Sequence, residues 1–477
     1  MIKKHRTAPA GPDTTAVSEA IETLLAELRK ALNAGDLLGS EIATAACMTL
    51  PLGPEVGPET SAGAFIELAG RSRRPEDAAM LRLILSLGSP AVKRAASKEL
   101  GNLTADGIFP ADWVTEAGKA TPLRATRHSD AFGELQVITV TYGYGGGEHA
   151  VAVAIASVDY PQVVQVSVTA DVAAFVPFPG ATREEEISLA EARRRMGPAL
   201  DYTEGDADQY EPEMVYLPIA RSRLRRLPVP DEADTRRYTA AERGAIADEF
   251  MASGQAADAV AADAAATRFW AEILTAYSSR IPDEPPGLIG PHRMRDILGE
   301  HVPTFYPVTQ AQRDQLRPAA AAWAAWSAAQ RGVPEAAGEL ADAAGQAIAA
   351  FEKQYDEPYY ATLRGYLADL VTSDADVEML RMALVRRTLA LPLPDDRPEK
   401  TDSLDAADPA TRRTVAAAEF TACALPDGVT REQLIAAAQR VVEELWTAEP
   451  PATWQHAERL SVDGTNRHDI IHALLNL

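Results

Sequence analysis

Apolar residues recur at steps of three and four along the first part of the chain, the spacing that places side chains on one face of an α-helix. After Thr14, the residues on such a face are Val17, Ile21, Leu24, Leu25 and Leu28. Further along, RPEDAAMLRLILSLGSPAVKRAASKEL has Pro75 where a helix would begin and Gly88 where it would end, which predicts a helical hairpin. We therefore expect a helical N-terminal region over residues 14–120, after a disordered tail at residues 1–13.

Strict alternation replaces this pattern in the middle of the chain, in the stretch VITVTYGYGGGEHAVAVAIASVDYPQVVQVSV that begins at Val137. Alternation with a period of two is typical of half-buried β-strands. A single pairing register puts one apolar set on the same face: Ile138, Val140, Val153, Ile155 and Val166. We predict one small antiparallel β meander within residues 121–177, with these side chains buried together.

The glycines of this stretch could either cradle a phosphate or turn the chain. A phosphate cradle needs its glycines between a strand and a helix, whose N–H groups then point at the ligand. Here Gly145, Gly146 and Gly147 lead into another strand. They predict the tight turn of a hairpin, and we expect no nucleotide there.

Polar residues near the hairpin form a candidate polar cluster. Arg124, Arg127, His128 and Asp130 precede the first predicted strand, and His149 lies at the mouth of the hairpin. The first four could converge near that end, but we interpret them as a salt-bridged loop. We interpret His149 as an edge residue rather than a base.

Residues 178–237 mix charge runs with prolines, and we predict that they form a linker. Arg221, Arg223, Arg225 and Arg226 are the main concentration of basic residues in it, and they are interleaved with leucines. This pattern favours an amphipathic helix whose arginines reach solvent over a nucleic-acid site.

Helical patterns return near Thr239, where TAAER has the Thr and Glu of a capping box. Trp323 and Trp326 lie one turn apart on an Ala-rich helix, which indicates core packing rather than a ligand cage. Residues 238–477 are therefore predicted to form a helical C-terminal domain. The fold class expected for the whole chain is α+β, predominantly α-helical, with the meander between two helical regions.

Charge and cysteine content limit the partners. The chain has 69 acidic and 46 basic residues, a formal net charge of −23, and a field of this sign repels phosphate backbones and anionic lipids. We expect no nucleic acid and no membrane as partner, and no stretch has the apolar length that spans a bilayer.

Cys47 and Cys423 lie far apart in apolar surroundings, outside any CxxC or His-paired pattern. We therefore predict that both are buried core residues and that the protein is in a reducing cytoplasm.

Four segments carry a resemblance to a known family: RHSDAFGELQVITVTYGYGGGEHAVAVAIASVD, ARSRLRRLPVPDE, FMASG and PAAAAWAAWSAAQRGVP. Over most of residues 110–355 the chain resembles an uncharacterised family of actinobacterial proteins. The resemblance implies a small β segment ahead of a long helical C-terminal region. It implies no activity.

The segment from His468 to His472, HDIIH, comes close to the HExxH zinc motif. Two histidines four residues apart lie one helical turn apart and can share a metal ion, while the acid between them, Asp469, serves as general base. Ile470, Ile471 and Leu474 would point inward, with both histidines at the border of that face.

Two features argue against zinc at this motif. Asp469 is one methylene shorter than the usual glutamate, and the third ligand would have to come from upstream, from Glu443, Glu444 or Glu458. We therefore expect two histidines that pack or hydrogen-bond at a helix boundary, and no stoichiometric zinc.

Two classes of function remain. We expect a cytosolic helical binding or regulatory protein without a catalytic site or cofactor, whose protein or small-molecule partner the sequence does not name. The alternative is a metal-dependent hydrolase, with zinc on His468 and His472 and with Asp469 as the catalytic base.

Overall fold

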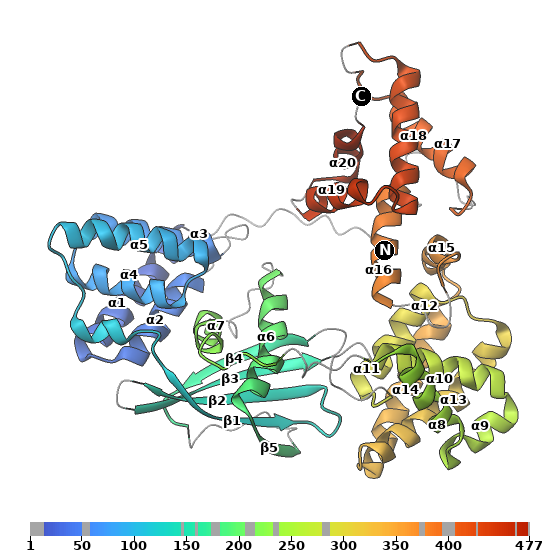
Figure 1. Ribbon diagram of the computed structural model, residues 1–477, viewed down its shortest axis with the longest axis horizontal. Coiled ribbons are helices and arrows are strands. Elements are labelled where there is room, and N and C mark those ends of the chain that lie inside the picture. The colour runs from blue at the N-terminus through green and yellow to red at the C-terminus, as the bar shows by residue number, and fades with distance from the viewer. Residues whose placement is uncertain are drawn as a thin grey trace. The chain divides into compact units, whose positions relative to one another are not determined.

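The computed structural model describes residues 14–49, 58–144, 147–157, 161–172, 182–205, 215–231, 238–278, 287–371, 377–393, 406–425, 428–462 and 465–475. The predicted tail at residues 1–13 lies outside them. The chain divides into two compact units, Met1–Arg236 and Arg237–Leu477. Helices predominate, and one small antiparallel sheet lies among helices of the first unit (Figure 1), so the predicted fold class is confirmed.

Five helices open the first unit: α1 (Thr14–Ala34), α2 (Leu37–Thr49), α3 (Pro58–Ser72), α4 (Pro75–Leu87) and α5 (Pro90–Ala105). The predicted hairpin is formed by α4 and α5, with Pro75 in the first turn of α4 and Gly88 at its C-cap. Ser89 caps α5, because its Oγ accepts a hydrogen bond from the Val92 N–H at 3.3 Å. Local sequence therefore sets the ends of these two helices.

The sheet has the strand order β4-β3-β2-β1-β5. Its strands are β1 (Thr121–Ser129), β2 (Leu135–Tyr144), β3 (Gly147–Ser157), β4 (Pro161–Thr169) and β5 (Arg183–Ile187). In the predicted meander, β2 to β4, Ile138 pairs with Val153 and Val153 with Val166. The five apolar residues of the predicted face are at most 2% exposed, which confirms the register. The turn residues Gly145 and Gly146 lie outside the described residues.

Two strands carry no apolar alternation, and sequence reasoning did not predict either segment as a strand. Arg127 and His128 belong to β1, although they were expected in a loop, and β5 is the acidic run REEEI. The two strands pair antiparallel, with Arg127 opposite Glu185 and His128 opposite Glu184. Opposite charges across a strand pair stabilise it without burial of an apolar face.

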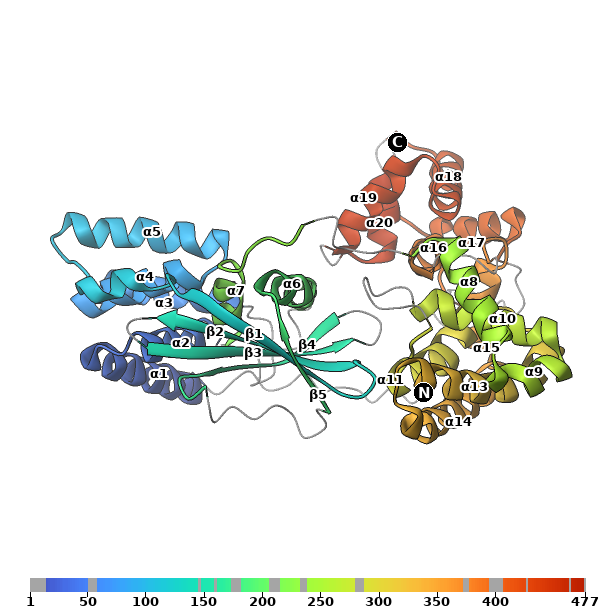
Figure 2. The ribbon, with the colours of Figure 1, turned by 60° about the horizontal axis from the view of Figure 1, so that its bottom comes forward.

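The stretch predicted as a linker, residues 178–237, instead helps to complete the first unit. Its described part contains β5, α6 (Leu189–Gly205) and α7 (Leu217–Leu224). Both helices pack on the sheet (Figures 1 and 2), and Met196, Leu200 and Ile219 are fully buried there. The linker prediction is wrong because it followed the charge runs and prolines and overlooked the apolar residues between them, which recur at helical spacing.

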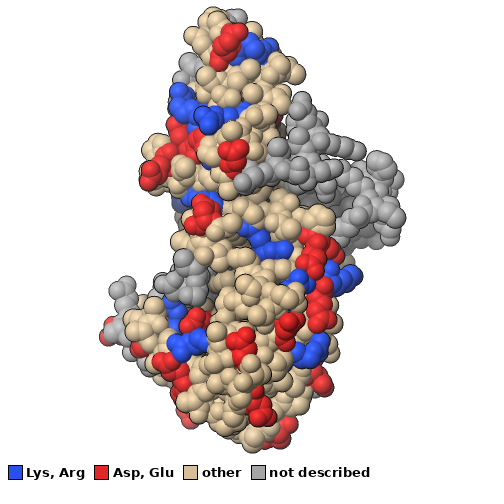
Figure 3. Space-filling model, turned by 90° about the vertical axis from the view of Figure 1, so that its right-hand side faces the viewer, with Lys and Arg blue, Asp and Glu red and all other residues tan. Residues whose placement is uncertain are grey.

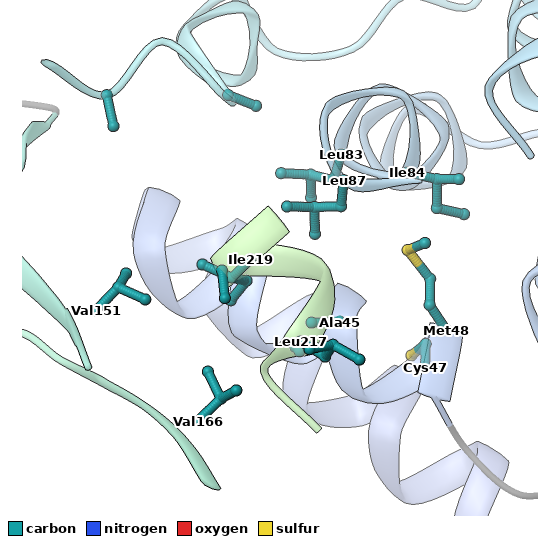
Figure 4. Close-up of a cluster of buried hydrophobic side chains, with 14 of the residues drawn as sticks. Ala45, Cys47, Met48, Leu83, Ile84, Leu87, Val151, Val166, Leu217 and Ile219 are labelled. Carbon is teal, nitrogen blue, oxygen red and sulfur yellow. The ribbon is translucent and has the colours of Figure 1, made fainter. Parts of the chain in front are cut away.

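Helices and sheet of the first unit share one apolar core. Helix α7 is central to it, because it packs on α2 and α4 as well as on β3. Figure 4 shows Leu217 and Ile219 of α7 among Leu83 of α4, Val151 of β3 and other core residues. Cys47 of α2 is fully buried, and this burial raises the pKa of its thiol to about 12. The predicted core role of Cys47 is confirmed.

A charged network is enclosed in the same unit. Arg223 of α7 and Glu41 of α2 form an ion pair in which both side chains are 0% exposed. Arg223 Nε donates to Nε2 of His149 at 3.1 Å, and the Gly118 N–H donates to Glu41 Oε1 at 3.0 Å. The guanidinium also lies 4.7 Å from the ring centroid of Tyr144. Because a buried charge needs partners, the network constrains how α2 and α7 sit against the sheet.

His149 is therefore not the edge residue that the sequence suggested. It lies in β3, an interior strand, it is 1% exposed, and its ring stacks on Tyr142 at a centroid distance of 5.6 Å. Burial, and then the positive charge of Arg223, lower the pKa of its imidazole to about 3. The imidazole is thus neutral and accepts the hydrogen bond from Arg223.

The arginines of α7 and the turn after it follow the prediction only in part: Arg225 and Arg226 are exposed, as expected of arginines that reach solvent, whereas Arg221 is half-buried. Arg223 is buried in the ion pair. The other three donate to main-chain carbonyl oxygens: Arg221 to Leu200 at 3.0 Å, Arg225 to Ser86 at 3.3 Å and Arg226 to Gly118 at 2.7 Å. These side chains link segments of the first unit that are distant in sequence, and a local sequence pattern cannot predict such contacts.

The second unit begins with α8 (Ala240–Met251), α9 (Ala257–Ala262), α10 (Ala264–Ser278), α11 (Pro291–Asp296), α12 (Val302–Phe305), α13 (Gln310–Gln330), α14 (Ala337–Gln354) and α15 (Pro358–Leu367). Thr239 and Glu242 form the predicted capping box of α8. Trp323 and Trp326 of α13 are buried, and both rings contact Phe250. Their predicted core role is confirmed.

The remaining helices of this unit are α16 (Val377–Ala390), α17 (Pro409–Thr421), α18 (Arg431–Thr447), α19 (Pro451–Val462) and α20 (Arg467–Leu474). They share an apolar cluster in which Phe420 of α17 and Leu434 of α18 join Ile471 of α20.

On the face of the molecule shown in Figure 3, acidic and basic side chains lie next to each other. No helix within the described ranges is long and apolar enough to cross a bilayer.

Candidate functional site

The HDIIH segment forms the first part of α20, where the chain turns back onto the apolar cluster. Asn466 is the N-cap, and its Oδ1 accepts from the Asp469 N–H at 3.0 Å. The inward residues Ile470, Ile471 and Leu474 are at most 5% exposed, as predicted. His468 and His472 are both partly buried at the border of this face, with ring centroids 4.8 Å apart.

The end of α17 supplies the facing side of the site. Glu419 and Phe420 lie in its last turn, and Cys423 follows just after the helix ends. Arg431 of α18 holds this end in place, because its Nη1 donates to the carbonyl oxygens of Phe420 at 3.0 Å and Cys423 at 2.6 Å. The position of Cys423 is thus set by main-chain contacts as well as by the helix.

Cys423, His468 and His472 meet here as a triad of potential metal ligands. One donor atom from each lies within 4.8 Å of the other two. The sulfur of Cys423 is 3.5 Å from Nε2 of His468. Both imidazoles pack on the ring of Phe420, at centroid distances of 5.0 Å for His468 and 5.2 Å for His472. This packing restrains the rotation of both rings.

A carboxylate and a guanidinium back the triad. Nδ1 of His468 lies 3.2 Å from Oε1 of Glu419. Arg467 Nη1 lies 2.6 Å from each Glu419 oxygen, and its other nitrogens donate to the carbonyl oxygens of Leu389 and Ala390. Glu419 is therefore fixed, and in turn it orients His468 with Nε2 toward the sulfur.

The protonation of the triad depends on burial. Burial, and then the negative charge of Glu419, raise the pKa of the Cys423 thiol. Burial, and then the neighbouring His468, lower the pKa of His472. Without an added cation the site therefore favours a neutral thiol and a neutral His472.

The donor set and its spacing suit a thiophilic divalent cation. Zinc takes sulfur at about 2.3 Å and imidazole nitrogen at about 2.0 Å, so two such ligands in a tetrahedral arrangement lie about 3.5 Å apart. The distance between Cys423 Sγ and His468 Nε2 is also 3.5 Å. Hydrogen bonding of an imidazole to a carboxylate on the side away from the metal is the usual support for a zinc-bound histidine.

The upstream glutamates expected as a third ligand do not belong to the triad. Glu443 pairs with Arg412 at 2.7 Å, and Glu444 accepts from Thr453 Oγ1 at 2.7 Å. Glu458 lies in α19 and is likewise outside the group of ligands found together in the described part of the chain. The third potential donor beside the two histidines is Cys423, which the sequence predicted to be a buried core residue.

Asp469, the expected general base, is engaged at the start of its own helix. Its Oδ2 accepts from Asn466 Nδ2 at 2.6 Å, and the residue is exposed. The structure thus joins His468 and His472 to Cys423 and Glu419, whereas Asp469 serves the cap.

The polar cluster expected near the hairpin is divided among separate contacts. Arg124 lies 3.6 Å from Glu148 and His128 3.7 Å from Glu184. Arg127 pairs with Glu185 at 2.8 Å and also donates to Gln136.

Asp130 closes the turn between β1 and β2. Its carboxylate accepts from the N–H groups of Phe132, Glu134 and Leu135 at 3.0 to 3.2 Å. His149 contacts Arg223 instead of these residues. The five predicted side chains therefore do not form one cluster, since each has partners of its own.

Comparisons with known proteins add no further assignment to this site. No family model, curated protein or solved structure matches the chain. The resemblance to an actinobacterial family stays a prediction, and function has to be argued from the site itself.

Proposed function

We propose that this chain is a metal-binding helical protein, which holds one zinc-like divalent cation on Cys423, His468 and His472. The observation that carries the proposal is the meeting of one sulfur and two imidazoles within 4.8 Å of one another, with Cys423 Sγ and His468 Nε2 at the 3.5 Å that tetrahedral zinc requires. Thiolate and imidazole are the donors that select zinc over the hard cations magnesium and calcium. A reduced thiol is required, which fits the cytoplasmic location expected from the sequence.

The residues around the triad support such a site. Glu419 would hold the Nδ1 proton of His468 and keep Nε2 free for the metal, and Arg467 would hold Glu419 in place. A bound dication deprotonates a coordinating thiol, which offsets the raised pKa of Cys423. Three protein ligands leave a fourth position for an exogenous group.

Binding is better supported than hydrolysis. A zinc hydrolase needs a carboxylate close to the open position as general base. Asp469 is held by Asn466 and Glu419 by Arg467, so the two nearest candidates are already engaged. A metal-dependent hydrolase remains the alternative, and release of a hydrolytic product by the zinc-loaded protein, lost on Asp469→Asn, would support it.

A cysteine nucleophile is a second candidate, because Cys423, His468 and Glu419 line up in the order of nucleophile, base and orienting acid. Two observations weigh against it. Cys423 follows the C-terminus of α17, whose partial negative charge opposes a thiolate, and its thiol pKa is raised rather than lowered. A catalytic arrangement of Cys423, His468 and Glu419 would also give His472 no role, whereas a metal ion would bind it.

Zinc analysis of the full-length protein tests the proposal. After reduction, zinc loading and dialysis, we expect about one zinc per chain, the stoichiometry of a site with three protein ligands. Cobalt substitution should add a thiolate-to-cobalt charge-transfer band. Cys423→Ser and His472→Gln should lose both signals. The matched controls are Cys47→Ala, at the buried second cysteine, and His456→Gln, at an exposed histidine of α19.

The outcomes separate the two candidates. Protection of Cys423 from iodoacetamide by added zinc supports the metal site. Failure of the wild type to retain zinc or cobalt, or retention by Cys423→Ser, would refute it. Rapid alkylation of Cys423 at neutral pH, faster than in the urea-unfolded chain and slowed by His468→Gln, would favour the nucleophile.

A further inference from the structure

A hollow of about 680 Å³ opens between helices of the second unit. Its wall is mainly apolar, with side chains from α15, α16 and the segment after α16: Tyr359, Leu363, Leu384, Val385, Pro392 and Leu393. Ligand pockets measure about 300 to 1,000 Å³ and are lined mainly by apolar groups. The hollow therefore has the size and the lining of a small-molecule site.

Two large apolar side chains of this wall are open to solvent. Tyr359 of α15 is 50% exposed and Val385 of α16 is 46% exposed. Isolated apolar residues on a surface are common, but these two line the same hollow. One molecule with an apolar body would therefore remove both of them from water at once.

The uncharged polar groups of the lining already have partners in the protein. Thr388 Oγ1 donates to the carbonyl oxygen of Val385 at 2.8 Å. The Asn466 side chain accepts from the Asp469 N–H at 3.0 Å and donates to the Asp469 carboxylate at 2.6 Å. A ligand is therefore not needed to satisfy these groups.

The charged groups of the lining neutralise each other. Glu419 and Arg467 form an ion pair at 2.6 Å, and the other nitrogens of Arg467 donate to main-chain carbonyl oxygens. The two ring nitrogens of His468 face Glu419 at 3.2 Å and the sulfur of Cys423 at 3.5 Å. A ligand ion would lose its water in the hollow without meeting a free opposite charge, so the lining favours an uncharged molecule.

We infer that the hollow binds an uncharged apolar small molecule, of the class of medium-chain alcohols and aromatic hydrocarbons. The inference does not depend on the proposed metal site, because the apolar wall on α15 and α16 carries no member of the triad. It gives the second unit a ligand site of its own.

Fluorescence titration of the reduced, metal-free full-length protein with 1-aminoanthracene, which is uncharged at neutral pH, tests the inference. We expect a saturable rise in fluorescence, which 1-octanol, octanoate and octylamine then compete to reverse. These competitors share one alkyl chain and differ in the charge of the head group. 1-Octanol should be at least about tenfold more effective than either ion, because an unpaired charge is costly to desolvate. Since each buried methylene strengthens binding about fourfold, 1-octanol should also be at least about tenfold more effective than 1-butanol.

Substitutions on α16 provide a matched comparison. Val385→Asp places a charge on the wall, and Val385→Trp fills part of the hollow with an uncharged side chain. The control is Met379→Asp, at a similarly exposed position of the same helix, 45% against 46%, outside the lining. Both Val385 variants should lose the saturable response and Met379→Asp should keep it, while circular dichroism shows that all three retain their helices.

Four results would overturn the inference. They are a wild-type chain without saturable binding, octanoate or octylamine more effective than 1-octanol, equal effects of 1-butanol and 1-octanol, and an unchanged response in both Val385 variants. Sedimentation of the wild type checks the remaining occupant. A dimer that Val385→Asp dissociates would mean that a second copy of the chain covers this wall, and it would also overturn the inference.

Discussion

A fall in pH should destabilise the first unit through His149, whose imidazole is enclosed with Arg223 and Glu41. Its pKa is about 3 in the folded unit, against about 6.5 in an unfolded chain. Below pH 6.5 the unfolded chain therefore binds a proton that the folded unit does not bind, and unfolding becomes more favourable. The loss of stability continues until the pH approaches about 3, where the folded imidazole protonates as well.

The size of this effect follows from the width of the window. Each pH unit below 6.5 lowers the free energy of unfolding by about 1.4 kcal/mol. Between pH 7.5 and pH 4.5 the contribution of His149 is about 2 to 3 kcal/mol, because only the two pH units below 6.5 count in full. His149→Gln removes the titration and keeps an oxygen that can accept from Arg223 Nε. Over this pH range the free energy of unfolding of the variant should therefore fall by about 2 to 3 kcal/mol less than that of the wild type.

Urea unfolding of the full-length protein at the two pH values measures the difference. A hydrogen-exchange pulse at one fixed pH, followed by mass spectrometry of peptides from β2 and β3, reports the first unit alone. The control is His128→Gln in β1, whose imidazole lies 3.7 Å from the exposed Glu184. Wild type and control should show the same acid sensitivity. Equal losses in His149→Gln and wild type would refute the reasoning.

Three further outcomes are expected. Glu41→Gln should lower the free energy of unfolding of the first unit, measured in urea, by about 3 to 5 kcal/mol, because it leaves the Arg223 charge buried without its partner. The control Glu67→Gln, at an exposed residue, should change this free energy by less than about 0.5 kcal/mol, and comparable losses in both variants would contradict the buried pair. The Cys47 thiol, buried and with a pKa of about 12, should resist Ellman's reagent at pH 8 until urea unfolds the unit, and prompt labelling in the native protein would count against this core. Glu419→Gln should weaken zinc affinity about 10- to 100-fold in a chelator competition, and unchanged affinity would mean that Glu419 does not support His468.

Local pattern was sufficient for much of the fold. The alternation of Ile138, Val140, Val153, Ile155 and Val166 predicts the register of the meander, because a slip of one residue would turn all of these side chains to the other face. Prolines, glycines and capping residues predict several helix ends, because they act on the backbone within a few residues. The inward face of α20 also follows from spacing alone.

Charged segments mark the limit of such reasoning. An alternation rule cannot detect β1 and β5, because the side chains that pair them come from segments far apart in the chain and are polar. Arg223 has the same sequence context as its solvent-facing neighbours, yet it is buried because Glu41, 182 positions away, neutralises it. Pairing at this separation is decided by the packing of whole elements.

The candidate site shows the same division. The i, i+4 spacing of His468 and His472 and their place at the border of the apolar face are properties of the sequence, since helix geometry determines both. Cys423 and Glu419 join them only because α17 and α20 pack on the same cluster around Phe420. A third candidate donor 45 positions from His468 has no signature in spacing, since its distance depends on how the intervening helices fold back. The sequence by itself therefore determined that the two histidines lie together at the border of the apolar face, and the tertiary structure alone decided which third donor meets them.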